Sequence, residues 1–185
     1  MTEREKLQLK RRVDYYQRKL SRYKTWLSKA AQLLEASKII EAKIKNDFDA
    51  LKNSGTAEKT GRLPFGLLEI HSLLVGFAIE NSLKAKWVKI NCRGSKNEML
   101  THSKLPKEIH GHNLLLLAGK VGLKLSADEC EWLNRLSEYL KWAARYPVPV
   151  EAKDLKPRLL SGSDLSKSNN LVFALNQRLW RKQLL

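Results

Sequence analysis

Basic side chains recur at helical spacing in the first 30 residues of this chain. On a helix of 3.6 residues per turn, Arg4, Arg11, Arg18, Arg22 and Lys29 fall on one narrow face, about 37 Å long at about 1.5 Å per residue. Residues 1–29 contain ten Lys and Arg but only three acidic residues. Such a row of cations can follow the phosphates of a nucleic-acid backbone, although any amphipathic helix also needs a solvated polar face.

Two aromatic residues flank this row of cations. Tyr15 and Trp26 lie beside it on the helical wheel, and aromatic rings beside a basic track can stack on bases. The sequence therefore predicts binding of RNA or another polyanion. The predicted nucleic-acid-binding residues are Arg4, Arg11, Arg18, Arg22, Lys29, Tyr15 and Trp26.

Histidine and cysteine residues do not form a metal-binding pattern. His110 and His112 make an H-x-H pair, but the chain has only four histidines, and Cys92 and Cys130 are far apart in the sequence. The glycines match neither a P-loop nor a G-x-G-x-x-G motif. We therefore expect no metal and no cofactor. Free thiols and a charged N-terminus without an apolar signal region favour the cytoplasm.

Composition favours a helical protein with a polyanionic partner. The chain has 185 residues and a net charge of +16, from 35 Lys and Arg against 19 Asp and Glu. An apolar content of 43% is enough for a core, and five prolines, nine glycines and the lack of alternating apolar runs argue against a sheet. We predict an all-α bundle in one domain, preceded by a long helical extension.

The most apolar stretch, residues 63–90, predicts the central helix of this bundle. Apolar side chains fall on all sides of the helical wheel, which is typical of a helix buried by several neighbours. Gly76 in its middle indicates close approach of another backbone. Glu69, His71, Glu80 and Lys84 interrupt the apolar run, so a membrane span is not expected.

Residues 1–52 form the first predicted unit, one long basic amphipathic helix packed on the bundle. It contains no proline or glycine over residues 3–52. Its apolar residues alternate three and four positions apart, as in a short heptad pattern. This seam consists of Val13, Tyr16, Leu20, Tyr23, Leu27, Ala30 and Leu34. Gly, Ser and Thr in residues 53–62 then predict a loop.

Residues 63–185 form the second predicted unit. A helix is expected to begin at His112, another at the S-x-x-E capping box Ser126–Glu129, and the last at Asp164 or Ser166. The last helix has two apolar stripes. The main stripe contains Leu165, Val172, Leu175 and Leu179, and the second contains Phe173, Trp180 and Leu184. Either a second subunit or residues 146–163 could cover the second stripe.

Three segments of the second unit together resemble the HEPN family (higher eukaryote and prokaryote nucleotide-binding domains). They are E-x-x-L-K-A at Glu80–Ala85, H-N-L-L-L-L-A at His112–Ala118 and R-Y-P at Arg145–Pro147. The resemblance covers about residues 63–185. It implies an antiparallel bundle of four or five helices, often dimeric. Many members are ribonucleases of toxin–antitoxin and defence systems, whereas others bind only nucleotides, RNA or protein partners.

The chain departs from the ribonuclease members of that family, which carry R-x(4–6)-H. No Arg–His pair in this sequence has that spacing. A metal-independent ribonuclease needs a group that takes the 2′-hydroxyl proton and a cation for the phosphorane charge. His112 and Arg145 could fill these roles if the 126–144 helix returns antiparallel to the 112–121 helix. The structural alternatives are a bond from His112 to the backbone or to Glu80, and an ion pair from Arg145 to Glu80 or Glu138.

Three hypotheses follow. The first is a non-catalytic HEPN-like protein that binds RNA or another polyanion and forms a homodimer. The second is a HEPN ribonuclease with a rearranged site of His112 and Arg145. The third is an interaction subunit whose basic surface docks an acidic protein partner, as in a toxin–antitoxin or defence complex.

Overall fold

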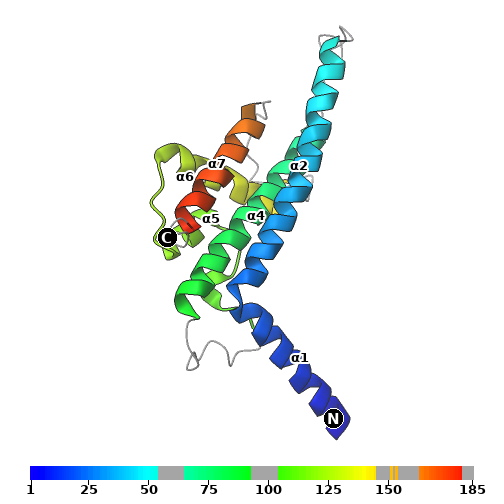
Figure 1. Cartoon of the computed structure of the whole chain (residues 1–185), viewed down its shortest axis with the longest axis vertical. Coiled ribbons are helices and arrows are strands. Elements are labelled where there is room, and N and C mark those ends of the chain that lie inside the picture. Colours follow the sequence, from blue (N-terminus) through cyan, green and yellow to red (C-terminus); the bar gives the residue numbers. More distant parts are fainter. Residues whose placement is uncertain (54–64, 93–103, 145–150, 152, 154–162, 181–185) are drawn as a thin grey trace.

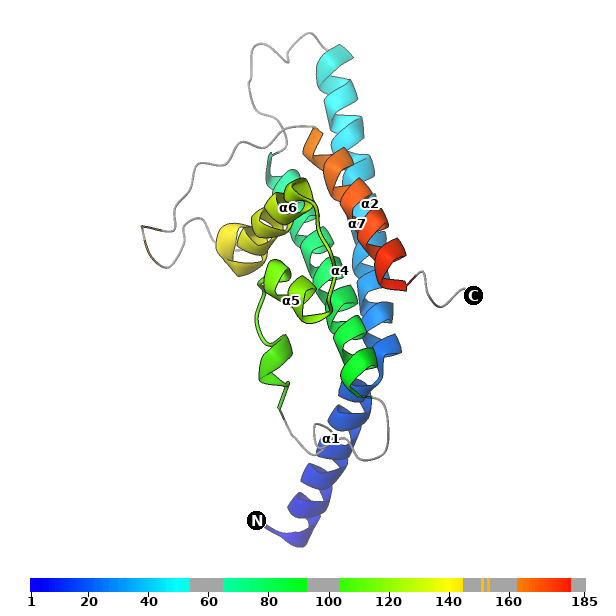
Figure 2. The same cartoon turned by 90° about the vertical axis from the view of Figure 1, so that its left-hand side faces the viewer.

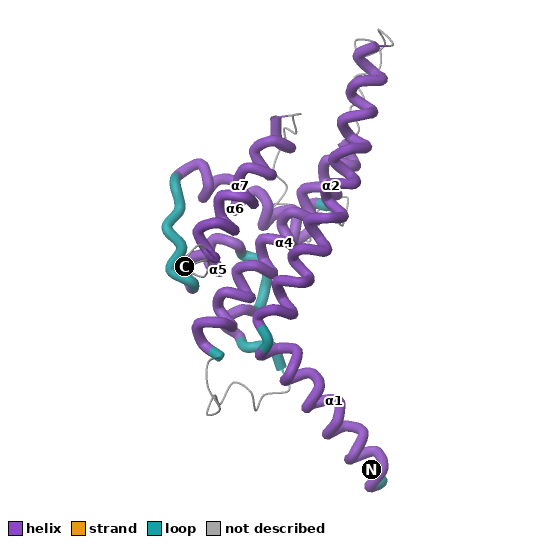
Figure 3. Tube along the Cα trace, in the orientation of Figure 1, coloured by secondary structure: helices purple, strands orange, loops and turns teal. Residues whose placement is uncertain are grey.

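The structure is entirely helical in the part of the chain that it describes. This computed structural model describes residues 1–53, 65–92, 104–144, 151, 153 and 163–180. Its α-helices are α1 (Glu3–Ser21), α2 (Tyr23–Asn53), α4 (Phe65–Asn91), α5 (Leu114–Lys120), α6 (Ala127–Glu138) and α7 (Ser163–Trp180). A 3-10 turn, η2 (Lys107–Ile109), precedes α5, and a π-helical turn, η3 (Tyr139–Ala143), extends α6. Figure 3 shows helices and loops but no strand over these residues, which confirms the all-α prediction.

Helix α4 is the centre of the bundle. It contacts α2, α5, α6, η3 and α7, and lies among them in Figures 1 and 2. Val75, Ile79 and Leu83 on α4 are all buried in the main core. A helix with apolar residues on every side loses most of its exposed apolar surface only when several neighbours cover it. The predicted central helix is therefore confirmed.

Gly76 allows one of these neighbours to approach α4. A Cβ atom at Gly76 would lie 3.1 Å from Cγ and from Cδ2 of Leu140. The close neighbour is thus a side chain of η3, whereas the sequence had indicated another backbone. None of the described helices has the length and apolar character needed to cross a membrane.

Helix α2 packs beside α4 in the opposite direction, and α7 runs alongside both (Figures 1 and 2). Ile44 of α2, Leu68 of α4 and Leu165 of α7 form a small second core where the three helices meet. The main core continues from α4 to α5, α6 and the rest of α7. The predicted bundle therefore has one layer of long helices, covered on one side by shorter ones.

The predicted single helix over residues 3–52 is wrong at one position. The chain leaves helical geometry at Arg22, where φ is −91° and ψ is 97°, and α2 starts at Tyr23. Trp26 donates its indole N–H to the carbonyl oxygen of Leu20 at 3.0 Å, which satisfies an acceptor left open at the end of α1. We call this junction, residues 19–29, the elbow. Figures 1 and 2 show α1 leading away from the bundle beyond it.

The shorter helices follow the predicted order. Ser126 accepts from Glu129 N–H at 3.2 Å and Glu129 Oε2 accepts from Ser126 N–H at 2.8 Å, which confirms the capping box. Leu114 N–H donates to Ser137 Oγ at 3.0 Å, so the start of α5 lies beside the end of α6. This contact confirms the antiparallel pairing of the two helices.

The two stripes of α7 have different environments. Leu165, Val172, Leu175 and Leu179 of the main stripe are buried. In the second stripe, Phe173 is 67% exposed, and Trp180 stacks on Tyr23 with ring centroids 5.9 Å apart. Leu184 lies outside the described residues. Part of the second stripe is thus covered by α2, which the sequence had not indicated.

Candidate nucleic-acid interface

The α1 half of the predicted basic row is exposed. Arg4, Arg11 and Arg18 are exposed on α1, whose first ten residues, Glu3–Arg12, are all exposed. Across the described residues, none of these three guanidinium groups forms an ion pair. Arg18 donates its Nε–H to the carbonyl oxygen of Asp14 at 3.3 Å. All three side chains can therefore reach an anion without first leaving a carboxylate.

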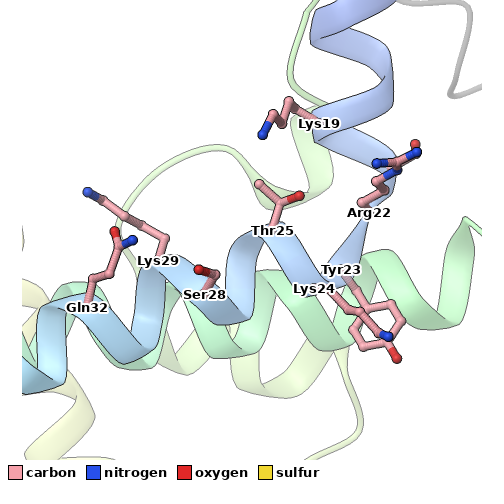
Figure 4. Close-up of a pocket in the computed structure, with 9 residues that line it drawn as sticks. Lys19, Arg22, Tyr23, Lys24, Thr25, Ser28, Lys29 and Gln32 are labelled. Carbon is pink, nitrogen blue, oxygen red and sulfur yellow. The ribbon is translucent and has the colours of Figure 1, made fainter.

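The elbow divides the predicted row in two. Arg22 and Lys29 do not continue the line of Arg4, Arg11 and Arg18, because α2 takes a new direction after Arg22. They line a concave surface of about 970 Å³ at the elbow (Figure 4). We call it the elbow pocket. Its lining residues are Lys19, Ser21, Arg22, Tyr23, Lys24, Thr25, Ser28, Lys29 and Gln32.

The elbow pocket is strongly cationic. Four of its nine lining residues are Lys or Arg, and none is acidic. In Figure 4, Thr25, Ser28 and Lys29 share one face of α2, and Lys19 reaches from α1 toward the space above that face. Thr25 and Ser28 add hydroxyl donors. Like charges held near one another repel, and a bound anion would remove this repulsion.

The two predicted aromatic residues have different positions. Tyr15 is 57% exposed, and the Nζ atom of Lys19 lies 5.5 Å from its ring centroid. Trp26 is half-buried against the main core, and its N–H is bonded to Leu20. Tyr15 is therefore the more accessible of the two rings, while Trp26 holds the elbow.

Sequence reasoning missed Lys19, Lys24, Thr25 and Ser28 as members of a site. In a continuous helix, Lys19 and Lys24 point to different sides, and only the bend at Arg22 places them around one concavity. No proline or glycine marks this bend. The signals that were present were the two lysines themselves and the high density of basic residues.

The second predicted site contains a buried chain of charges. His112 Nδ1 lies 2.7 Å from Glu80 Oε2, and Glu80 Oε1 lies 2.6 Å from Lys84 Nζ. The side chains of Glu80 and Lys84 are each 6% exposed, compared with 36% for His112. The edge of the Phe77 ring packs against His112 with centroids 5.9 Å apart. The bond to Glu80 is the structural alternative expected for His112 from the sequence.

Arg145 lies outside the described residues, so its distance from His112 stays a prediction. Over the described residues, no group of three His, Cys, Asp or Glu side chains is placed to hold a metal ion. Cys92 and Cys130 are free cysteines, and burial raises the pKa of the Cys92 thiol.

Comparison of the chain with protein-family models, with curated proteins and with solved structures finds no match. The resemblance to HEPN domains therefore depends on the three motifs quoted above. Two of these motifs are in contact through the bond between Glu80 and His112, and the R-Y-P motif lies outside the described residues.

Proposed function

We propose that this chain is a non-catalytic HEPN-like protein that binds RNA, or another polyanion, through α1 and the elbow. The observation that carries the proposal is the exposure of Arg4, Arg11 and Arg18, which have no carboxylate partner among the described residues. The net charge of +16 supports it, because a large positive charge attracts polyanions over distances of about a Debye length.

Binding would follow from the chemistry of these side chains. Each guanidinium can donate two parallel hydrogen bonds to a phosphate, and each contact releases counterions condensed on the nucleic acid. The exposed ring of Tyr15 can stack on a base. Because α1 extends away from the bundle, a strand can reach its cations without meeting the other helices (Figure 2).

The test is a titration of labelled single-stranded RNA and DNA, followed by fluorescence anisotropy at several salt concentrations. Each phosphate contact contributes about 0.7 to the slope of log affinity against log salt for single strands. The triple variant Arg4→Gln, Arg11→Gln, Arg18→Gln should therefore reduce the slope by about 2. Its affinity at moderate salt should fall by about tenfold, or about 1.4 kcal/mol.

The matched control removes three cations that already have acidic partners. Lys38, Lys43 and Lys153 pair with Glu35, Asp47 and Glu151, respectively. The variant Lys38→Gln, Lys43→Gln, Lys153→Gln has the same net charge as the arginine variant. Equal losses of slope in the two variants, or an affinity that does not change with salt, would contradict the proposed interface.

A ribonuclease activity is the second candidate, and the contact of Glu80 with His112 favours it. A carboxylate on Nδ1 fixes the imidazole tautomer and leaves Nε2 to take the proton of a 2′-hydroxyl group. Attack of that oxygen on the adjacent phosphodiester would form a 2′,3′-cyclic phosphate and break the bond from phosphorus to the 5′-oxygen, which would take a proton from water to give a 5′-hydroxyl end. His112→Ala should then abolish cleavage of single-stranded RNA. Intact RNA after hours with the unaltered protein would exclude this candidate.

The remaining expectations concern partners and the biological system. The resemblance to HEPN domains supports a homodimer and a role in a toxin–antitoxin or defence system, and the basic surface supports an acidic protein partner as a third candidate. Sedimentation analysis of the purified chain would measure the oligomeric state. Recovery of a stable complex from cells after nuclease treatment would favour the protein partner over RNA.

A further inference from the structure

Helix α1 has an apolar stripe that the described part of the chain leaves largely uncovered. Leu9, Val13 and Tyr16 lie four and three positions apart, which is the a and d spacing of a coiled coil. Leu9 is 51% exposed, Tyr16 is 37% exposed and Val13 is half-buried. Leu20, the next residue of the pattern, is buried at the elbow. We call Leu9, Val13 and Tyr16 the α1 seam.

The same spacing continues in α2, where it serves packing within the chain. Tyr23 and Leu34 pack against the main core, and Ala30 is buried. The bend at Arg22 separates the two halves of the pattern, and α1 leads away from the bundle beyond it (Figures 1 and 2). Side chains at a and d positions lose their exposed apolar surface when a second helix packs on them. The α1 seam therefore has the pattern of a helix-docking surface.

The narrow width of the α1 seam favours a single helix as its partner. A stripe of strict a and d positions is narrower than the apolar face that a helix turns toward a protein core. Lys10, Arg12 and Asp14, which lie between the seam residues in the sequence, are polar and exposed. A helix bound at a membrane surface buries a broader face, rich in Trp, Phe and Leu. One helix covers a stripe of this width.

The charges beside the α1 seam favour an acidic partner. Lys10 and Arg12 occupy e and g positions, which flank the a and d positions of a heptad. Both side chains are exposed, and neither forms an ion pair among the described residues. Side chains at these positions form salt bridges across a coiled coil and determine the choice of partner. Glutamate or aspartate on the partner helix would therefore complement them.

A second copy of this chain complements these charges less well. Its α1 has two acidic residues at e and g positions, Glu3 and Glu5, and both are already bonded within the helix. Glu3 Oε1 lies 2.7 Å from Lys6 Nζ, and Glu5 Oε2 accepts from the N–H of Thr2 at 2.7 Å. A second copy would also bring another net charge of +16, so the two chains would repel each other.

We propose that the α1 seam binds an acidic amphipathic helix of another protein, as in a short coiled coil. Apolar residues of that helix would cover the α1 seam, and its carboxylates would pair with Lys10 and Arg12. Arg4, Arg11 and Arg18 recur every seven residues on the opposite face of α1. The proposal thus gives the acidic protein partner a defined surface, and it does not depend on RNA binding.

The experiment uses synthetic helical peptides of about three heptads as probes. The first peptide has leucine at a and d and glutamate at e and g, and the repulsion between its glutamates keeps it from pairing with itself. The second has lysine in place of the glutamates, and the third has the composition of the first with its leucines moved out of a and d. Binding to the full chain is measured by fluorescence anisotropy at 0.15 M salt. We expect only the first peptide to bind at micromolar concentrations.

Two pairs of variants locate the bound peptide on α1. Leu9→Gln, Tyr16→Gln should lower its affinity at least about tenfold, because two apolar contacts are lost. Leu7→Gln, Tyr15→Gln is the matched control, since it alters the same residue types, 51% and 57% exposed, outside the a and d positions. It should lower the affinity less than about twofold. All four side chains are exposed, and circular dichroism should show equal helix content in both variants.

The second pair of variants tests the flanking charges. Lys10→Gln, Arg12→Gln should lower the affinity for the glutamate peptide about fivefold. Arg4→Gln, Arg11→Gln has the same net charge on the opposite face of the helix and should lower it less than about twofold, because salt screens charges more than about 8 Å apart.

The proposal is overturned if the glutamate peptide fails to bind at about 0.1 mM, or if the lysine peptide binds as tightly. It is also overturned if both variants of either pair lose affinity equally. Sedimentation of the chain alone and with vesicles of phosphatidylcholine and phosphatidylglycerol tests two other occupants. Self-association or vesicle binding that Leu9→Gln, Tyr16→Gln abolishes and Leu7→Gln, Tyr15→Gln retains would assign the α1 seam to a second copy or to a membrane instead. RNA binding should be unchanged in Leu9→Gln, Tyr16→Gln, and its absence from the unaltered chain would contradict the proposed function alone.

Discussion

Two charged regions of this chain balance their charges in different ways. Between α4 and the start of α5, Glu80 contacts both Lys84 and His112, and the Glu80 and Lys84 side chains are almost completely buried. On α1 and at the elbow, Arg4, Arg11, Arg18 and Arg22 are exposed, and no carboxylate of the described residues pairs with them. The charges of the first region are neutralised by other side chains of the same chain. The charges of the second region are available to water or to a binding partner.

This difference separates charges that maintain the fold from charges that can recognise a ligand. A buried charge is costly without a partner, so Glu80, Lys84 and His112 depend on one another. An exposed cation costs little in stability, and its removal should change association rather than folding. The variants below test this division, beginning with the largest expected effect.

Removal of Glu80 should have the largest effect on folding. Glu80→Ala leaves the Lys84 ammonium buried without its carboxylate, and breaking a buried ion pair costs about 3–5 kcal/mol. Urea unfolding followed by circular dichroism measures the loss. The matched control is Glu35→Ala, which removes a carboxylate from the exposed pair with Lys38 and should change the free energy of unfolding by less than about 0.5 kcal/mol. Similar losses in both variants would contradict the division.

His71 is a buried titratable group without an ion pair among the described residues, and its effect on stability should depend on pH. Burial lowers the pKa of His71, which the nearby Lys45 lowers further, while Glu41 acts in the opposite direction. Its Nε2 has no hydrogen-bond partner among the described residues. Unfolding therefore lets His71 take up a proton between its lowered folded pKa and about 6.5. Stability should fall as the pH drops below about 6.5, with a slope of at most about 1.4 kcal/mol per pH unit.

The test of His71 compares how steeply the free energy of unfolding changes with pH in two chains. Free energies of unfolding are measured between pH 7.5 and 5 for the unaltered chain and for His71→Gln, which is neutral throughout. The slope should become shallower in the variant. Glu41 also has a lowered pKa, because hydrogen bonds from Lys45 and Asn169 outweigh the opposing effect of burial. Its loss of stability begins only below about pH 4.5, outside this window. Identical slopes would show that His71 does not titrate on unfolding.

The hydrogen bond of Trp26 at the elbow should contribute about 1 kcal/mol to the free energy of unfolding. Trp26→Phe keeps an aromatic ring but removes the donor to the carbonyl oxygen of Leu20, and a neutral hydrogen bond contributes about 0.5–1.5 kcal/mol. Trypsin should then cleave after Arg22 or Lys24 faster than in the unaltered chain, since the elbow opens more often. Tyr15→Phe, which alters an exposed ring on α1, is the control and should leave the cleavage rate unchanged. An unchanged cleavage rate in Trp26→Phe would show that this hydrogen bond does not stabilise the elbow.

The elements with strong local signals were predictable from the sequence. The apolar run of residues 63–90 predicted α4, and Ser126 with Glu129 predicted the start of α6, because in each case neighbouring residues fix the structure. The main stripe of α7 was predictable for the same reason. Leu165 and Val172 are buried as their spacing requires.

The elbow was not predictable, because distant contacts determine it. Residues 13–34 keep a continuous heptad pattern across Arg22, and every residue there is compatible with a helix. The bend is instead stabilised by Trp26 with Leu20 and by Trp180, which comes from the other end of the chain. The elbow pocket depends on this bend, so its lysines could be seen in the sequence, but their positions around one concave surface could not.

The smallest expected effect concerns two single cations of α1. It tests whether RNA binding depends on the net charge or on which cations are paired with a carboxylate. Lys6 and Arg11 lie on the same helix, and the Nζ atom of Lys6 is 2.7 Å from Glu3 Oε1, whereas Arg11 has no ion pair with the described residues. Arg11→Gln should lower the salt slope of RNA binding by about 0.7, since one phosphate contact is lost. Lys6→Gln should leave the slope unchanged, because a lysine that stays paired with Glu3 makes no phosphate contact and displaces no counterion from the RNA.

Neither Lys6→Gln nor Arg11→Gln should change the free energy of unfolding by more than about 0.5 kcal/mol, so both titrations compare folded chains. The two variants have the same net charge, and at 0.15 M salt charges more than about 8 Å apart interact weakly. A lower slope in Arg11→Gln alone would therefore reflect the local pairing of each cation. Equal salt slopes in the two variants would mean that RNA binding depends on the total charge of α1. Whether a cation on this helix is paired with a carboxylate would then have no effect on RNA binding.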